Sequence, residues 1–242
     1  VLKTQLNATI HFATKTQNQE ILAENPYINQ IHCLDKGIIS FAKKLRKERF
    51  DLIVDLHVNL RTFILKLILQ KKWYSLDKLN LQKWLLTQFK IDSLPNKHIV
   101  DRNIETIAPL GVKMDELGLD YFIPEKDEVE ISWLPETHQN GYVAEVVEAM
   151  HKTIQLPSKT LIELYHRINK PIILIGGKAE KETGLLIEDF FRPTTEATEN
   201  KMKELGKRAT IFNACGKFNL GQSASLIKQA SFVFTHDTGM MH

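Results

Sequence analysis

The 242-residue sequence predicts an α/β protein with two parallel-sheet domains. Short apolar runs rich in β-branched or aromatic residues alternate with longer segments of helical periodicity, which is the pattern that βαβ units produce. These strand-like runs fall into two sets, separated by a stretch with little periodicity. The chain is also longer than one average domain, which suits either one large α/β unit or two ordinary domains with ample cores.

The predicted domain boundary lies in the stretch between the two sets of strands. Pro124 to Asn140 carries prolines and acidic residues and has little periodicity except around Ile131 to Leu134. We place the boundary near residue 138, which gives domains of residues 1–138 and 139–242. The predicted strands are Ala8 to Thr14, Ile28 to Leu34, Phe50 to Leu56, Leu119 to Ile123, Tyr142 to Val147, Pro171 to Ile175, Thr210 to Ala214 and Phe232 to His236.

Composition excludes several classes of protein. The net charge of +3 is too small to indicate a nucleic-acid partner. No apolar run approaches the roughly 20 residues that a transmembrane helix needs. The two cysteines, Cys33 and Cys215, are far apart, which suits reduced thiols in a cytoplasmic protein better than a disulfide framework.

Lys36 to Arg49 is predicted to form an amphipathic helix with a strongly basic face. A solvated helix surface explains such a charge run. The alternative is attraction to a membrane rich in acidic lipid, which further basic and aromatic residues would reinforce. Those residues are Arg61, Lys66, Lys71, Lys72 and Trp73.

The segment Phe232 to His242 is an apolar strand that ends in a polar turn containing glycine. Ligands of open α/β sheets bind beyond the carboxyl ends of strands, and Gly239 allows close approach of the backbone to a diphosphate. Thr238 adds a hydroxyl donor, and Asp237 suits sugar hydroxyls or the support of loop amides. Turn and capping roles are the alternative for these residues. His236, Asp237 and His242 could also be interpreted as metal ligands, but no further cluster with metal-ligand spacing accompanies them, so no metal is expected.

A second candidate site follows the predicted strand Pro171 to Ile175. This strand ends in Gly176-Gly177, and Glu180 comes near the start of the next helix. An acidic residue just beyond a βα turn is well placed to accept hydrogen bonds from ribose hydroxyls. Its alternative role is a favourable interaction with the helix dipole.

Several motifs, in this order and spacing, resemble glycosyltransferase family 9, the bacterial heptosyltransferases. The motifs are Phe50-Asp-Leu-Ile-Val-Asp-Leu-His-Val-Asn-Leu-Arg61, Ile172 to Glu180, Phe212-Asn-Ala-Cys-Gly-Lys-Phe-Asn-Leu220, Ser223 to Ala230 and Thr235-His-Asp-Thr-Gly-Met-Met-His242. The resemblance implies a GT-B fold, with two Rossmann-like domains facing a cleft. It also implies an inverting transferase that moves heptose from ADP-heptose to the lipopolysaccharide inner core without a bound metal or other cofactor.

The resemblance also assigns roles to individual residues. It places the nucleotide sugar in the C-terminal domain and a lipid-linked anionic saccharide acceptor in the N-terminal domain, at the cytoplasmic face of the inner membrane. Arg61 would face the acceptor, because a guanidinium suits phosphate or carboxylate; a surface role at a helix start is the alternative. The expected donor residues are Asp237, Thr238, Gly239, His242, Glu180, Thr153 and Phe218.

Asp55 and His57 alternate on one predicted strand and superficially suggest a catalytic dyad. We expect instead that Asp55 is buried and hydrogen-bonded near the strand end.

Two residues depart from the family pattern near the expected diphosphate. The pattern reads approximately Thr-Lys-x-x-Pro, but Ile154 occupies the Lys position, and Glu148 replaces a small residue. A missing cation and an added anion both oppose binding of a diphosphate. A catalytically impaired homologue that binds nucleotide or a partner is therefore an alternative, and a GT-B enzyme that uses another nucleotide sugar is a second.

Both ends of the sequence also differ from the family pattern. Family members begin with a strand and a Gly-Asp loop whose Asp is the proposed general base, and the sequence before Val1 and after His242 is expected to be missing. The catalytic base is therefore unassigned, and the chain as it stands is expected to be inactive.

Overall fold

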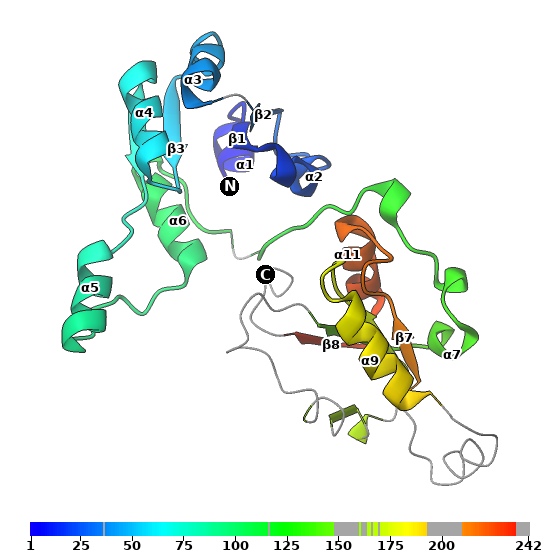
Figure 1. Cartoon of the computed structure of the whole chain (residues 1–242). Helices are drawn as coiled ribbons and strands as arrows, with labels where there is room; N and C mark the ends of the chain where they lie inside the picture. The colour runs from blue at the N-terminus through cyan, green and yellow to red at the C-terminus, as the bar shows by residue number, and fades with distance from the viewer. Residues whose placement is uncertain are drawn as a thin grey trace, which may run out of the picture. The chain divides into compact units, whose positions relative to one another are not determined.

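The structure, a computed structural model, describes residues 1–35, 37–115, 117–147, 160, 164–165, 167–168, 170–192 and 210–235. The chain forms two compact units, Val1–Phe122 and Ile123–His242. Both contain parallel strands connected through helices, which confirms the predicted α/β class (Figure 1).

The first unit contains two parallel strand pairs. Strand β1 (His11–Lys15) pairs with β2 (Gln30–Leu34), and β3 (Leu52–Asp55) pairs with β4 (Lys72–Ser75). The core lies where α3 (Ile38–Arg46) and α4 (Leu60–Leu69) pack together, because their buried apolar side chains form one cluster with residues of the neighbouring strands. The remaining elements are α1 (Leu2–Leu6), η1 (Thr16–Asn18), α2 (Gln19–Leu22), α5 (Asn80–Phe89), α6 (Ile99–Ile107) and η2 (Ala108–Leu110).

Two strand predictions in this unit were wrong. The sequence analysis missed β4, a four-residue strand in which a lysine and a serine flank two aromatic residues. It also predicted a strand over Leu119 to Ile123, where the structure has none. The apolar composition of that segment suits a strand, but Gly118 with φ of 85° precedes it, and Leu119 remains 65% exposed. A strand requires a neighbouring strand to complete its hydrogen bonds as well as apolar side chains.

The second unit is built on a four-stranded parallel sheet in the order β7-β6-β5-β8. The two central strands are buried at every position, because helices cover both faces of the sheet. This explains why both strands are nearly continuous apolar runs. The strands are β5 (Val143–Val146), β6 (Ile172–Ile175), β7 (Ile211–Asn213) and β8 (Phe232–Thr235). The helical elements among the described residues are η3 (Glu125–Asp127), η4 (Ile131–Trp133), α7 (Glu136–Gln139), α9 (Lys181–Phe191) and α11 (Leu220–Gln229).

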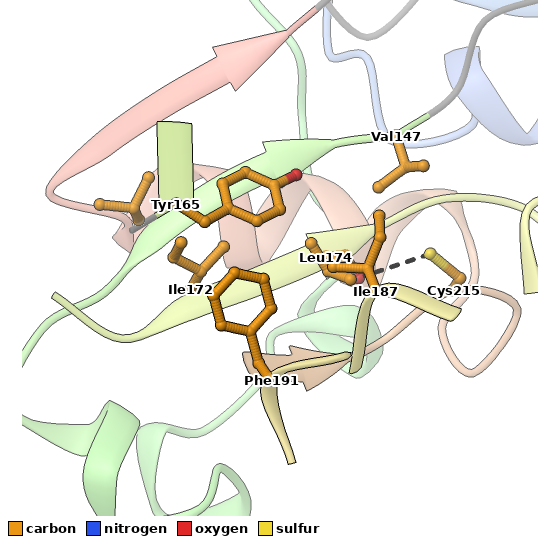
Figure 2. Close-up of a cluster of buried hydrophobic side chains, with 8 residues drawn as sticks. Val147, Tyr165, Ile172, Leu174, Ile187, Phe191 and Cys215 are labelled. Atoms are coloured by element: carbon orange, nitrogen blue, oxygen red, sulfur yellow. Dashed lines mark hydrogen bonds between the residues drawn. The ribbon is translucent and has the colours of Figure 1, made fainter. Parts of the chain in front are cut away.

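Each face of this sheet has its own apolar cluster. On one face, Ile187 and Phe191 of α9 pack with Tyr165 and Leu174 (Figure 2). On the other face, Leu226 of α11 packs with strand residues and with the segment that precedes β5. The sheet is therefore the middle layer of a three-layer unit.

The segment of residues 123–138 belongs to the second unit, so the division differs from the predicted boundary near residue 138. The Val129 amide donates to the Ser225 hydroxyl at 2.9 Å, and the Gln229 side chain donates to the Val129 carbonyl at 2.8 Å. His138 is buried, and its Nε2 lies 3.2 Å from the Ile172 carbonyl oxygen. Weak periodicity suggested a linker, but these tertiary hydrogen bonds hold the segment against α11 and β6.

Glu145 in the central strand β5 is only 2% exposed, although it carries a carboxyl group. Burial raises its pKa from 4.5 to about 8, because the charged form loses its hydration. The Tyr165 hydroxyl offsets part of this rise in the pKa of Glu145. Among the described residues, neither this hydroxyl nor Glu145 Oε2 has a hydrogen-bond partner of acceptable geometry. Burial is the main cause that raises the pKa of Tyr165, and the negative charge of Glu145 is the second.

Glu145→Gln is expected to flatten the dependence of stability on pH. Because folding raises the pKa of Glu145 from 4.5 to about 8, the folded state keeps a proton that the unfolded state releases between these values. The wild-type free energy of unfolding should therefore fall as pH rises from 4.5 to 8, by an amount on the order of 4 kcal/mol. Urea unfolding at pH 5 and pH 8.5 measures this change. An equal slope in Glu145→Gln would contradict the assignment, and the exposed Glu136→Gln serves as control.

Candidate functional site

In the turn after β6, the side chain of Glu180 lies against Gly176 and Gly177. Glu180 immediately precedes α9, and a Cβ atom added to Gly177 would lie 3.1 Å from Glu180 Oε2. A Cβ atom added to Gly176 would lie 3.0 Å from Glu180 Cβ. The absence of side chains at both glycines therefore lets the half-buried Glu180 fold back over the turn. Its carboxylate can accept hydrogen bonds from a pair of ligand hydroxyls at this edge.

Close packing of α9 on β7 fixes the position of Glu180. A Cβ atom added to Gly184 would lie 2.4 Å from Asn213 Oδ1, so only glycine allows this approach. Asn213 is buried, and the same Oδ1 accepts a hydrogen bond from the Cys215 amide at 3.0 Å. The Gly184 amide in turn donates to the Glu180 carbonyl at 2.9 Å.

The turn after β7 is hydrogen-bonded to the turn after β6. The Gly216 amide donates to the Gly176 carbonyl at 2.9 Å, and Gly216 adopts a φ of 70°. Between these turns, burial, followed by the negative charge of Glu180, raises the pKa of the Cys215 thiol to about 12. A thiol that stays neutral is a weak nucleophile, so Cys215 has a packing role.

The predicted donor loops start from adjacent strands of the same sheet. Val146 of β5 and Thr235 of β8 are partners in the parallel register. The carboxyl ends of these strands therefore lie side by side, at the edge where β6 leads to Glu180. Several predicted residues lie outside the described residues, and their roles remain predictions: Glu148, Thr153, Ile154, Asp237, Thr238, Gly239 and His242.

Phe218 is half-buried and packs against the apolar cluster that includes Leu226. Its predicted contact with adenine remains a prediction. The neighbouring Asn219 caps α11, because its Oδ1 accepts from the Gln222 amide at 2.8 Å, while its Nδ2 donates to Asp127 at the same distance. These contacts hold the end of the Phe218 turn in place.

Asp127 is a residue that the sequence analysis missed. It is 4% exposed, and its Oδ2 would lie 2.6 Å from a Cβ atom added to Gly221. The sequence showed Asp127 only as one of several acidic residues in an expected linker. Its close approach to α11 depends on a glycine far away in the sequence.

In the first unit, Arg61 lines an open cleft of about 660 Å³. The cleft lies where β1 and β2 end and where α3 and α4 begin, since Lys15, Leu34 and Gly37 also line it. Arg61 and Lys15 are exposed cations. Asp35 also lines the cleft and accepts a hydrogen bond from the Thr16 hydroxyl. The cleft therefore offers two cationic side chains to an anionic ligand.

The buried Asp55 shapes the turn that leads to Arg61. Its Oδ1 accepts hydrogen bonds from the backbone amides of His57 at 3.0 Å and Val58 at 2.8 Å, and its Oδ2 lies 3.6 Å from Lys66 Nζ. This confirms that Asp55 is a bonded strand-end residue. It contacts the backbone of His57, whose side chain is exposed, so the two form no dyad.

A model of glycosyltransferase family 9 (heptosyltransferase) matches residues 38–242 of this chain. No curated protein matches the chain. Among the described residues, no group of three or more His, Cys, Asp or Glu residues is arranged to hold a metal ion.

Three solved structures share the fold. A family 9 glycosyl transferase from Veillonella parvula has a TM-score of 0.69 and 18% identity, and the match covers 97% of this chain and 68% of that one. E. coli ADP-heptose lps heptosyltransferase II has a TM-score of 0.71 and 15% identity, covering 100% and 73%. E. coli heptosyltransferase WaaC with ADP has a TM-score of 0.60 and 17% identity, covering 99% and 74%. These matches confirm the α/β fold with parallel sheets.

Asp55→Ala is expected to lower the free energy of unfolding by about 2–3 kcal/mol, because two backbone amides and Lys66 lose their acceptor. Asp51→Ala, at an exposed position in the same segment, should change it by less than about 0.5 kcal/mol. Equilibrium denaturation measures both values. Equal effects of the two substitutions would show that the Asp55 contacts contribute little.

Proposed function

The chain belongs to glycosyltransferase family 9, and from this premise we propose that it transfers heptose from ADP-heptose to the inner core of lipopolysaccharide with inversion. The observation that carries the proposal is the Glu180 carboxylate held over Gly176 and Gly177 at the carboxyl edge of the second unit's sheet. Nucleotides bind at this edge of α/β sheets. In the reaction, an acceptor hydroxyl attacks the anomeric carbon and gives up its proton to a base that is not assigned in this chain, the bond to the diphosphate breaks, and ADP leaves.

The second unit is proposed to bind the donor. Glu180 would accept hydrogen bonds from the two ribose hydroxyls, and Phe218 would contact adenine with its exposed part. The segments after β5 and β8 start beside each other and would enclose the diphosphate. The residues proposed there are Thr153, Asp237, Thr238, Gly239 and His242. We propose that catalysis uses no bound metal or other cofactor.

The first unit is proposed to bind a lipid-linked anionic saccharide. Arg61 and Lys15 supply the positive charge of its cleft, and a guanidinium can hold a carboxylate or phosphate through two parallel hydrogen bonds. We also propose that the protein acts in a bacterial cytoplasm, at the cytoplasmic face of the inner membrane. The lipid-linked acceptor requires such a location.

Two sequence features favour a second candidate, a catalytically impaired homologue that still binds nucleotide or a partner. Ile154 replaces the cation expected beside the diphosphate, and Glu148 adds a negative charge nearby in the sequence. A related enzyme with another nucleotide sugar would share the fold and differ in its choice of nucleotide.

Calorimetric titration tests the proposed donor site. We expect the protein to bind ADP in preference to UDP, and Glu180→Gln to weaken ADP binding about tenfold, because one charged acceptor of the ribose hydroxyls is lost. Glu182→Gln is the matched control, since Glu182 is an exposed carboxylate in the first turn of α9. Equal affinity for ADP and UDP would indicate another donor, and no binding of either would favour the impaired homologue.

Arg61→Ala is expected to weaken binding of a lipopolysaccharide fragment with an anionic inner-core sugar by about tenfold or more, with the Kd for ADP unchanged. Arg61→Lys should recover part of the loss, because it restores the charge without the planar fork. Calorimetric titration of the fragment measures the effect without requiring turnover, and Arg46→Ala provides an exposed control in the same unit. Unchanged affinity for the fragment would remove Arg61 from the acceptor site.

A further inference from the structure

Helix α4 has apolar residues on two opposite sides. Leu65 and Leu69 are buried in the cluster shared with α3. Leu60, Phe63 and Leu67 are spaced to fall on one opposite stripe, and they are 75%, 56% and 60% exposed. A helix of a water-soluble domain normally turns its polar side outwards, so a second apolar stripe indicates a surface that contacts something else.

Helix α5 adds a second group of exposed apolar residues in the same unit. Leu81 is 65% exposed, Trp84 51% and Phe89 58%, and α5 buries none of its residues. The rings of Trp84 and Phe89 contact each other edge to face, with centroids 5.2 Å apart. Tryptophan is favoured at membrane interfaces because its large ring is apolar and its N–H group is polar.

Positive charge is concentrated in the same segment. Residues 60–91 contain seven Lys or Arg residues and a single acidic residue, Asp77, although the net charge of the whole chain is only +3. Lys66 points inwards, since its Nζ lies 3.6 Å from Asp55 Oδ2. Lys71, Lys72, Lys83 and Lys90 are exposed, so they can interact with an external anionic surface. We call α4 and α5, with the lysines that accompany them, the basic apolar surface.

Helix α9 in the second unit shows that charge distinguishes this surface from other exposed apolar residues. Leu186 is 74% exposed and Phe190 57% exposed on α9. Their neighbours on the helix include Glu182, Glu188 and Asp189, which would repel an anionic surface. Among these helices, exposed apolar side chains and excess positive charge occur together only in the basic apolar surface.

We propose that the exposed apolar residues of α4 and α5 face the same side of the first unit and that this basic apolar surface binds an anionic lipid bilayer, with Phe63, Leu67 and Trp84 entering the headgroup region. No helix in the described part of the chain is long and apolar enough to cross a membrane. Apolar side chains that enter the interface, together with lysines that contact anionic lipids, produce reversible surface binding. The inference rests on the proposed function in one respect, which is the lipid-linked acceptor. Arg61 lies on α4 and lines the cleft, so binding through α4 would bring the cleft near the headgroups.

The location of this surface differs from the sequence-based expectation, which centred on residues 36–49. Helix α3 buries Phe41, Ala42 and Leu45. Of the large apolar residues described on α3, only Ile39 is strongly exposed, at 59%. Trp73, expected to reinforce the membrane contact, packs against the α3–α4 cluster. The exposed apolar area therefore lies on α4 and α5.

Vesicle co-sedimentation, without nucleotide or acceptor, tests this proposal. The protein should bind phosphatidylglycerol vesicles at 50 mM salt about tenfold more strongly than phosphatidylcholine vesicles, and Leu67→Glu should weaken the binding to phosphatidylglycerol about tenfold. Leu186→Glu is the matched control, because it places the same charge at an exposed leucine of α9. Circular dichroism and thermal unfolding would establish that both variants fold. Equal binding by Leu67→Glu and the wild type would overturn the proposal.

Quenching of tryptophan fluorescence by brominated phosphatidylglycerol locates the contact. The three tryptophans are Trp73, Trp84 and Trp133. Quenching should be largely lost in Trp84→Phe and retained in Trp133→Phe, whose tryptophan is 59% exposed in the other unit. Loss of quenching in Trp133→Phe instead would overturn the assignment. A dimer in solution that Leu67→Glu converts to a monomer would also overturn it, because the surface would then bind a second copy of the chain. ADP calorimetry is a separate measurement, so failure of the donor site and failure of the membrane surface remain distinguishable.

Discussion

Burial of the two central strands of the second unit determines the arrangement of its other parts. Each residue of β5 and β6 is buried, so both faces of the sheet must be covered by helices and apolar side chains. The parallel direction of the strands then places every strand-to-helix turn at one edge. The Glu180 turn and the starts of the two segments after Val146 and Thr235 meet there for this reason. The proposed nucleotide site at this edge rests on the topology as much as on the identity of its residues.

Two glycine contacts hold helices close to their supports. Gly184 allows α9 to approach Asn213, and Gly221 allows α11 to approach Asp127. In both cases a polar side chain occupies the space where a Cβ atom would be. Each contact also affects the proposed donor site, because α9 starts after Glu180 and α11 starts after the Phe218 turn. Alanine at these positions would stabilise an isolated helix more than glycine does, but its Cβ atom would prevent the close approach of each helix to its polar neighbour.

Helix α4 connects the two proposed roles of the first unit. The Asp55 turn and the capping box of Asn59 and Thr62 fix where the helix begins. Arg61 in the first turn then lines the cleft, while Leu65 and Leu69 pack against α3. The remaining side of the helix carries the exposed apolar stripe. A single helix therefore contributes to the proposed acceptor cleft, the core and the proposed membrane surface, as the proposed lipid-linked acceptor would require.

The sequence by itself determined the class of fold, most strands and the family, because apolar periodicity and ordered motifs are local properties. The runs at Pro171 to Ile175 and Thr210 to Ala214 each contain the observed strand, and Asp55 is buried as expected. Only the tertiary structure decided which segments pack together. It assigned residues 123–138 to the second unit through contacts with Ser225 and Gln229, and it left Leu119 to Ile123 outside any strand. It also buried Glu145 and exposed Leu67, because burial depends on neighbours that are distant in the chain.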